Sequence, residues 1–272
     1  MSALSLPTTF EISSRSLSRT LRIYMKEAKY ELLKNLRLPV YSVATIAFPV
    51  MFYVLFGIVL PHNNPADRTE TATYVLTSMG CFGIIAAALF GFGVSLAMER
   101  GQGWLQVKRA SPMPIGAYFF GKLFSAMVFS TVILLVLLAL GYGFGGVHLP
   151  ALTAAKLVGI LVLGAIPFCA MGLAIGYLAK PNSAPGIVNL IYLPMSFCSG
   201  LWIPLFMLPH GLRTFAKLLP PFHLSQLALN AVGMGMEPHS TWGHVEALIG
   251  FTLIFLGIAV LGYRRDEGKT YG

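Results

Sequence analysis

Apolar residues gather in six long blocks along the chain, separated by shorter polar segments. Each block is continuously apolar and holds about 20 residues or more, enough to cross a hydrocarbon core as a helix. Strands would alternate apolar and polar positions, and the lipid phase offers the backbone no partners, so helices are the expected form. The pattern predicts an all-α polytopic membrane protein with six transmembrane helices, at Val40–Leu60, Thr73–Leu96, Ala117–Tyr142, Ala154–Leu178, Ala184–Phe206 and Trp242–Tyr263.

An amphipathic helix is predicted over Thr20–Leu36, ahead of the first block. Leu21, Ala28, Leu32 and Leu36 recur at helical spacing on one face. Basic residues on the other face are typical of a helix in the membrane interface. The candidate interface residues are Arg22, Lys26 and Lys29. A solvated leader helix without a role is the alternative.

A compact charged segment, about 97–114, lies between the second and third blocks. Its composition is compatible with a short helix, and its place between two spans suggests that a partner pushes on it. The segment contains Glu99, Arg100, Gly103, Trp104, Leu105, Lys108, Arg109 and Pro112.

The stretch of about 204–232, after the fifth block, is too apolar for a free loop and too rich in proline for a span. A re-entrant helical element at the external face fits this pattern, because backbone there must be shielded by protein or water. An ordinary external loop with a short helix remains the alternative. This part of the chain includes Trp202, Pro204, Phe206 and Phe222.

Composition agrees with a membrane protein: 56% of the 272 residues are hydrophobic, 11% are charged, and the mean hydropathy is +0.73. Soluble domains carry about 25% charged residues. The net charge of +9 could indicate nucleic-acid binding, but its distribution indicates topology. All of the 19 Lys and Arg residues fall on one predicted side except Arg68, Lys156, Arg213 and Lys217. The positive-inside rule therefore places both termini in the cytoplasm.

The predicted organisation is a cytoplasmic N-terminus at 1–38, a transmembrane domain at 39–263 and a cytoplasmic tail at 264–272. No cleavable signal peptide is expected, because the first apolar run begins only near Val40. The three cysteines fall inside predicted spans and are expected to be buried thiols.

The search for chemistry predicts no catalytic, cofactor-binding or metal-binding residues. Gly116–Leu123 resembles a phosphate-binding loop, but Leu123 stands where a hydroxyl should bind magnesium. The six histidines lack metal-ligand spacing and are expected to be solvated loop residues. Lys122 is expected to extend toward the interface.

Two other classes of protein stay open as alternatives. An ion-coupled secondary transporter would need polar groups at the membrane midplane, and no chain of such residues crosses the predicted spans. A non-catalytic membrane scaffold needs no chemistry at all.

Three features resemble the membrane subunit of type-2 ABC exporters, the ABC-2 permeases. One is Glu99-Arg100 with Gly103 and Ser111-Pro112. The second is the series from Ser199-Gly200 through Pro204 and Pro209 to Leu219-Pro-Pro-Phe-His223. The third is the plan of an amphipathic leader, six spans and a short basic tail.

The resemblance implies a permease in the bacterial cytoplasmic (inner) membrane that binds two copies of a cytoplasmic ATPase, with ATP and Mg on that partner. A second permease copy, identical or homologous, would complete it. The segment at 97–114 would be the coupling helix. The resemblance makes its candidate contact residues with the ATPase Glu99, Arg100, Gly103, Trp104, Leu105, Lys108, Arg109 and Pro112. The external element would act as a gate, with the candidate gate residues Trp202, Pro204, Phe206 and Phe222. The expected cargo is an amphiphile: a drug, a lipid or a lipid-linked glycan. Candidate residues of its path are Phe52, Phe56, Phe82, Phe90, Asn189, Tyr192 and Phe197.

Overall fold

The computed structural model describes residues 17–60, 65–111, 113–236 and 241–270, and these residues form helices joined by short connections, with no strand. The predicted all-α fold is confirmed. The α-helices are α1 (Leu17–Leu36), α2 (Pro39–Tyr53), α3 (Pro65–Ala88), α4 (Ser95–Gly101), α5 (Trp104–Ala110), α6 (Ile115–Gly143), α7 (Ala151–Leu163), α8 (Ala165–Leu178), α9 (Ala184–Cys198), α10 (His210–Ala216), α11 (Pro220–Ala231) and α12 (Thr241–Thr270). Two π-helical segments, η1 (Val54–Val59) and η2 (Leu89–Val94), and two 3-10 turns, η3 (Pro181–Ser183) and η4 (Leu205–Met207), complete them.

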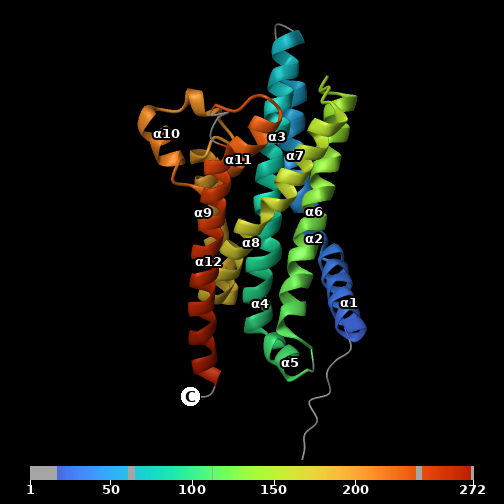
Figure 1. Ribbon diagram of the computed structural model, residues 1–272, viewed down its shortest axis with the longest axis vertical. Helices are drawn as coiled ribbons and strands as arrows, with labels where there is room; N and C mark the ends of the chain where they lie inside the picture. The colour runs from blue at the N-terminus through green and yellow to red at the C-terminus, as the bar shows by residue number, and fades with distance from the viewer. Residues whose placement is uncertain (1–16, 61–64, 112, 237–240, 271–272) are drawn as a thin grey trace, which may run out of the picture.

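Five helical stretches among the described residues are long and apolar enough to cross a membrane, and each overlaps one of the six predicted spans. The longest, Asp67–Gly101, joins α3, η2 and α4 into one rod through the middle of the bundle (Figure 1). The others are Pro39–Val59, Ile115–Gly143, Ala151–Leu178 and Thr241–Arg265.

The predicted span at Ala184–Phe206 is shorter in the structure, where α9 holds 15 residues and ends at Cys198. The backbone gives the reason. Gly200 adopts a φ of 81°, and its N–H donates to the Phe197 carbonyl while that of Leu201 donates to the Ser196 carbonyl. This is the Schellman arrangement that terminates helices. A side chain at position 200 would also meet Leu205 at 2.5 Å.

The centre of the bundle depends on close backbone contact between the second and fourth spans. A Cβ on Gly93, in η2, would lie 2.8 Å from the Gly172 carbonyl oxygen of α8, so only glycine allows this approach. Gly176, one turn further on, approaches the Gly93 carbonyl in the same way. The Gly172–Gly176 pair therefore packs helices within one chain, as its spacing predicts.

The two ends of the bundle differ in what they carry. α1 and α5 lie at one end, toward which α12 also runs, and α10 lies near the opposite end (Figure 1). We call these the α5 end and the α10 end.

The predicted amphipathic helix corresponds to α1, which packs against α6. Its buried residues are Ala28, Glu31 and Asn35, so the face toward the bundle is partly polar. Leu21 and Met25 are more than half exposed. The predicted interface residues Arg22, Lys26 and Lys29 are also exposed. An exposed surface of apolar and basic side chains is what a helix at a membrane interface presents.

Candidate functional site

Four charged side chains meet inside the α5 end: Glu31 of α1, Lys34 of α1, Glu99 of α4 and Lys122 of α6. We call them the charge cluster. The Nζ of Lys122 lies 2.9 Å from Glu31 Oε1 and 3.1 Å from Glu99 Oε1. Lys34 Nζ lies 2.6 Å from Glu31 Oε1 and also pairs with Glu99. Two carboxylates and two ammonium groups balance, which is what allows charges to be buried here.

Lys122 is the most enclosed member of the cluster, with 1% of its surface exposed. The sequence prediction that this side chain extends to the interface is wrong. The Lys122 ammonium group stays buried because it finds partners inside the bundle. It donates to Glu31 of α1 and Glu99 of α4, and to Ser95 Oγ at 2.8 Å.

Hydroxyl and amide groups tie the cluster to its surroundings. Tyr118 donates a hydrogen bond from its hydroxyl to Glu99 Oε2 at 2.7 Å. One turn along α1, Asn35 Nδ2 donates to Ser125 Oγ of α6 at 2.9 Å. Together these bonds join α1, α4 and α6 into one unit.

Lys34, like Glu31, lies on α1 and outside the candidate spans, and its pKa is raised. Burial on its own lowers the pKa of an ammonium group, but the charges of Glu31 and Glu99 and their hydrogen bonds outweigh burial. Lys34 therefore stays charged throughout the physiological range.

Arg100 binds the end of a neighbouring helix. Its guanidinium donates to the carbonyl oxygens of Tyr177 and Ala179, the latter at 2.8 Å. These carbonyls belong to the C-terminal end of α8, where a cation is favoured by the helix dipole. Arg100 thus fixes the start of the α4–α5 turn to the fourth span.

The turn itself requires glycine. Gly103 has a φ of 76°, in the left-handed region, and its carbonyl accepts the first bonds of α5 from Gln106 and Val107. The predicted single helix over 97–114 is therefore divided: α4 completes the second span, and only α5 crosses the end of the bundle.

α5 has an anchored face and an exposed face. Leu105 is 4% exposed and packs with Leu96 and Tyr118, and Lys108 pairs with Glu27 of α1 and lies 4.5 Å above the Tyr118 ring. Trp104 and Val107 point outward, 55% and 61% exposed.

The predicted contact residues are therefore split by the structure. Glu99, Arg100, Leu105 and Lys108 have partners within this chain, Gly103 makes the turn, and Trp104 is exposed. The side chain of Arg109 and all of Pro112 lie outside the described residues.

A second group of candidate residues gathers around Trp202, which follows α9. The Trp202 ring lies 4.3 Å from Phe52, 4.9 Å from Phe197 and 5.1 Å from Phe82, measured between centroids. We call these four rings, with Tyr192, the aromatic cluster. Tyr192 stacks on Phe82 at 4.7 Å and donates from its hydroxyl to the Phe82 carbonyl at 2.8 Å.

The aromatic cluster brings together the first, second and predicted fifth spans, which sequence alone left separate. Phe56 stacks beside Phe52, and Phe90 lies 6.4 Å from Tyr192. Asn189 is exposed on α9 and takes no part in these ring contacts.

An apolar cavity of about 640 Å³ opens beside the aromatic cluster, toward the α10 end. Phe56, Trp202, Pro204 and Phe206 line it, with Tyr74 and Glu70 from α3. The predicted gate residue Phe222 lies elsewhere, buried beneath α10 with Leu205, Leu208 and Ala216.

Two histidines differ from the prediction of solvated loop residues. His244, in α12, is 2% exposed, and its Nδ1 lies 3.0 Å from Nδ1 of His223 in α11. His223 also bonds the Lys217 carbonyl through Nε2 at 3.0 Å, so this Nε2 carries a proton. Sequence spacing could not show this pair, because the residues lie 21 positions apart on different helices.

The cysteines match their prediction in part. All three are free, and Cys81 and Cys169 are buried while Cys198 is partly exposed. Among the described residues, no three His, Cys, Asp or Glu side chains are grouped to hold a metal ion.

The long apolar helices indicate a multi-pass membrane protein. At its α5 end, the buried charge cluster joins α1, α4 and α6. The chain belongs to the ABC-2 type transporter family, whose model matches residues 27–232. It is similar over 247 residues, with 25% identity, to the protein named "Putative transport permease YvfS" of Bacillus subtilis (strain 168). The match covers 91% of this chain and 99% of that protein. The chain is thus the permease subunit of an ABC-2 transporter, a class of permease that pairs with ATPase subunits.

Proposed function

We propose that this permease is the membrane subunit of an ATP-driven exporter of amphiphilic molecules. Two copies of a cytoplasmic ATPase supply the energy, with ATP and Mg bound on those subunits, and a second permease completes the passage. The α5 end faces the cytoplasm of a bacterial inner membrane. The charge distribution supports this orientation, because two of the four basic residues expected outside are Arg213, in α10, and Lys217, directly after it.

α5 is the proposed coupling helix, and its two faces carry the proposal. Trp104 and Val107 are exposed and available to bind a partner. Aromatic side chains such as Trp104 contribute much of the binding energy at protein interfaces. Leu105 and Lys108 hold the other face of α5 to α6 and α1. A displacement of α5 by the ATPase would therefore move α6 and α1 with it.

Glu99 and Arg100 act as positioning residues in this proposal. Glu99 links α4 to α1 and α6 through the charge cluster, and Arg100 links it to α8. Movement of α5 then tilts the second span together with its neighbours. Glu99 and Arg100 do not need to touch the ATPase for coupling to depend on them.

α9 serves as the fifth of six spans. It begins next to η3, where Pro181 lies against Gly101 at the α5 end, and after its last turn Gly200 accepts a bond from Tyr74 near the start of α3. Fifteen residues rise about 22 Å, and the Trp202 turn completes the crossing. The element at 204–232 then forms a gate on the outer face.

Amphiphilic cargo is favoured by the apolar cavity and the aromatic cluster beside it. Sites for small apolar molecules are concave, lined by aromatic side chains and marked by few polar groups. Here Glu70, Thr71 and Tyr74 supply polar groups beside Phe56, Trp202 and Phe206.

The test is to express the chain with the ATPase encoded beside it, purify the permease in mild detergent and identify what accompanies it by mass spectrometry. A stoichiometric ATPase subunit supports the proposal. A chain that purifies alone, with no effect on the hydrolysis rate of that ATPase after joint reconstitution in nanodiscs, contradicts it and favours a scaffold.

A further inference from the structure

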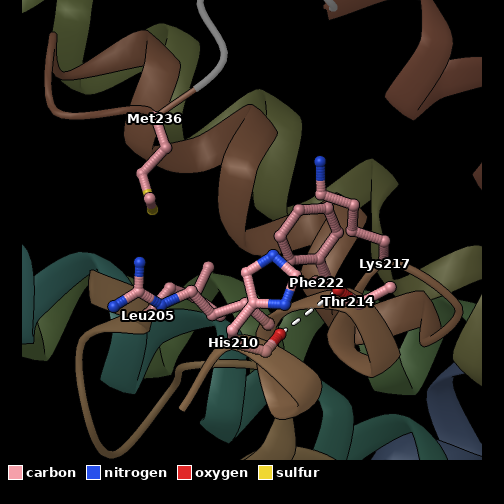
Figure 2. Close-up of a pocket in the computed structure, with 7 residues that line it drawn as sticks. Leu205, His210, Thr214, Lys217, Phe222 and Met236 are labelled. Carbon is pink, nitrogen blue, oxygen red and sulfur yellow. Dashed lines mark hydrogen bonds between the residues drawn. The ribbon is translucent and has the colours of Figure 1, made fainter. Parts of the chain in front are cut away.

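A second cavity, of about 240 Å³, lies on the other side of the η4 turn from the apolar cavity. His210, Arg213, Thr214 and Lys217 line it from one face of α10 and the residue that follows this helix, at positions three and four apart. Figure 2 shows His210, Phe222 and Lys217 next to one another around this cavity, with Met236 approaching from a separate segment.

The charges of this cavity are of one sign. Arg213 and Lys217 are cations, His210 can become one, and none of the described residues lining the cavity is Asp or Glu. Basic residues are scarce at this end of the bundle, where the sequence predicts only Arg68 and Lys156 besides these two. Two of them within five positions of one another mark α10 as a local centre of positive charge.

The guanidinium of Arg213 is held in place by its own loop. Its Nε donates to the Leu208 carbonyl at 2.7 Å, and a second nitrogen donates to the Phe206 carbonyl. A guanidinium has five N–H donors, and these two bonds use two of them. The group is thus oriented before any ligand arrives, which lowers the entropy cost of binding. The Thr214 hydroxyl donates to the His210 carbonyl oxygen at 3.2 Å, so its proton is already used within α10.

The two cavities are separated by one short segment of chain, whose neighbouring residues line one cavity or the other. Pro204, Phe206 and Met207 face the apolar cavity, whereas Leu205, between them, faces the basic one. Met234 and Met236 are divided in the same way. A molecule that lies across this segment meets apolar side chains on one side and cations on the other, while Glu70 disfavours an anion in the apolar cavity.

We propose that this pair of cavities binds an amphiphile with a phosphate-type headgroup, its anion at Arg213 and Lys217 and its apolar chain against Phe206 and Trp202. Arg and Lys are the residues that recognise phosphate oxygens through charge-assisted hydrogen bonds. The binding step stands on the cavities alone. Its role in transport rests on the proposed function, and would make the cargo an anionic lipid-like molecule.

The binding test uses the purified chain without any ATPase, so its failure is distinct from failure of the exporter proposal. The probes are dioleoyl phosphatidylglycerol and dioleoyl phosphatidylcholine, titrated in detergent and counted on the protein by native mass spectrometry. The variant is His210→Gln with Lys217→Gln, both at exposed positions, and Lys156→Gln is the matched control for an exposed cation elsewhere at this end. Circular dichroism and gel filtration show that each variant is folded.

We expect phosphatidylglycerol to bind more tightly than phosphatidylcholine, and the double variant to lose about tenfold of that affinity, as the loss of charged hydrogen bonds predicts. Lys156→Gln should bind like the wild type. Equal affinity for the two lipids, or an unchanged double variant, overturns the proposal.

Inorganic phosphate and dihexanoyl phosphatidylglycerol separate the two possible sources of the anion. Weak competition by both, with tight binding only of the long-chain lipid, supports an amphiphile that uses both cavities. If inorganic phosphate alone displaces the lipid at equal concentration, the basic cavity takes free phosphate and the amphiphile proposal is wrong. Phe206→Ala should reduce binding of the long-chain lipid and leave inorganic phosphate binding unchanged.

Discussion

The carboxylate of Glu99 lies 3.1 Å from the ammonium group of Lys122, where the second span ends and the third begins. Both side chains are almost fully enclosed, with 15% of Glu99 and none of Lys122 exposed. The pair joins the end of the second span to the third, on either side of the segment that carries α5. The remaining members of the charge cluster extend this connection to α1.

Glu99→Gln should destabilise the permease, because it leaves Lys34 and Lys122 to share the single carboxylate of Glu31. Breaking a buried ion pair by removing one partner costs about 3 kcal/mol, and we expect the apparent melting temperature in detergent to fall by roughly 5 °C or more. Glu246→Gln, at an exposed position of α12, is the control. If Glu99→Gln and Glu246→Gln melt alike, the charge cluster does not stabilise the fold.

The contribution of Lys34 should depend on pH in a defined direction. Its folded-state pKa is raised by Glu31 and Glu99 against the effect of burial, so the stabilisation is complete below the unfolded value of about 10.4 and declines as pH rises through the folded value. The difference in melting temperature between wild type and Lys34→Gln should be constant from about pH 7 to pH 9 and narrow above about pH 10.4. A difference that already narrows between about pH 7 and pH 9 would contradict this assignment.

Gly103→Ala isolates the backbone requirement of the turn before α5. No atom lies within 4 Å of a Cβ added at Gly103 or at Gly143, but only Gly103 has a positive φ. We expect Gly103→Ala to cost about 1 kcal/mol and to reduce ATP hydrolysis by the assembled transporter, whereas Gly143→Ala should be tolerated. Gly103→Asn should retain more activity, because asparagine adopts the left-handed conformation more readily. Equal effects of the two alanine substitutions would show that the turn does not depend on that conformation.

Trp202→Ala should open the aromatic cluster. The ring is packed against Phe52, Phe82 and Phe197, and removal of a packed aromatic side chain costs about 3–5 kcal/mol. Trp242, which is 77% exposed, provides the control, since exposed substitutions stay within about 0.5 kcal/mol. Thermal unfolding of the two alanine variants, together with transport of a fluorescent amphiphile, measures the difference. If Trp202→Ala has the same melting temperature and transport rate as Trp242→Ala, the aromatic cluster contributes neither to stability nor to transport.

The apolar blocks predicted five of the spans, because length and hydropathy are properties of a local stretch of sequence. The same pattern overextended α9: apolar residues continue to Phe206, and the signal that ends the helix is the backbone conformation at Gly200. Likewise the charged segment was predicted as one helix, although Gly103 divides it.

The charge cluster lay beyond sequence reasoning for a different reason. Glu31 and Lys122 lie 91 positions apart, and only tertiary packing shows that they meet. The aromatic candidates were identified by residue type, but their convergence on Trp202 also depends on the fold. Arg100 and Leu105 were expected to face a partner, but in the structure Arg100 binds carbonyls at the end of α8 and Leu105 packs against Tyr118 of α6.

The assignment of α5 as the coupling helix is tested most directly by replacing Trp104 with alanine. The measurement is the amount of ATPase subunit that remains bound to the purified permease. Trp104 is 55% exposed on α5 and belongs to none of the buried core clusters, so Trp104→Ala should fold normally. We predict that this variant loses about tenfold or more of its affinity for the ATPase, as removal of an interface anchor would, while Trp242→Ala retains the wild-type ratio. Retention of the ATPase at the wild-type ratio by Trp104→Ala would contradict the assignment of α5 as the coupling helix.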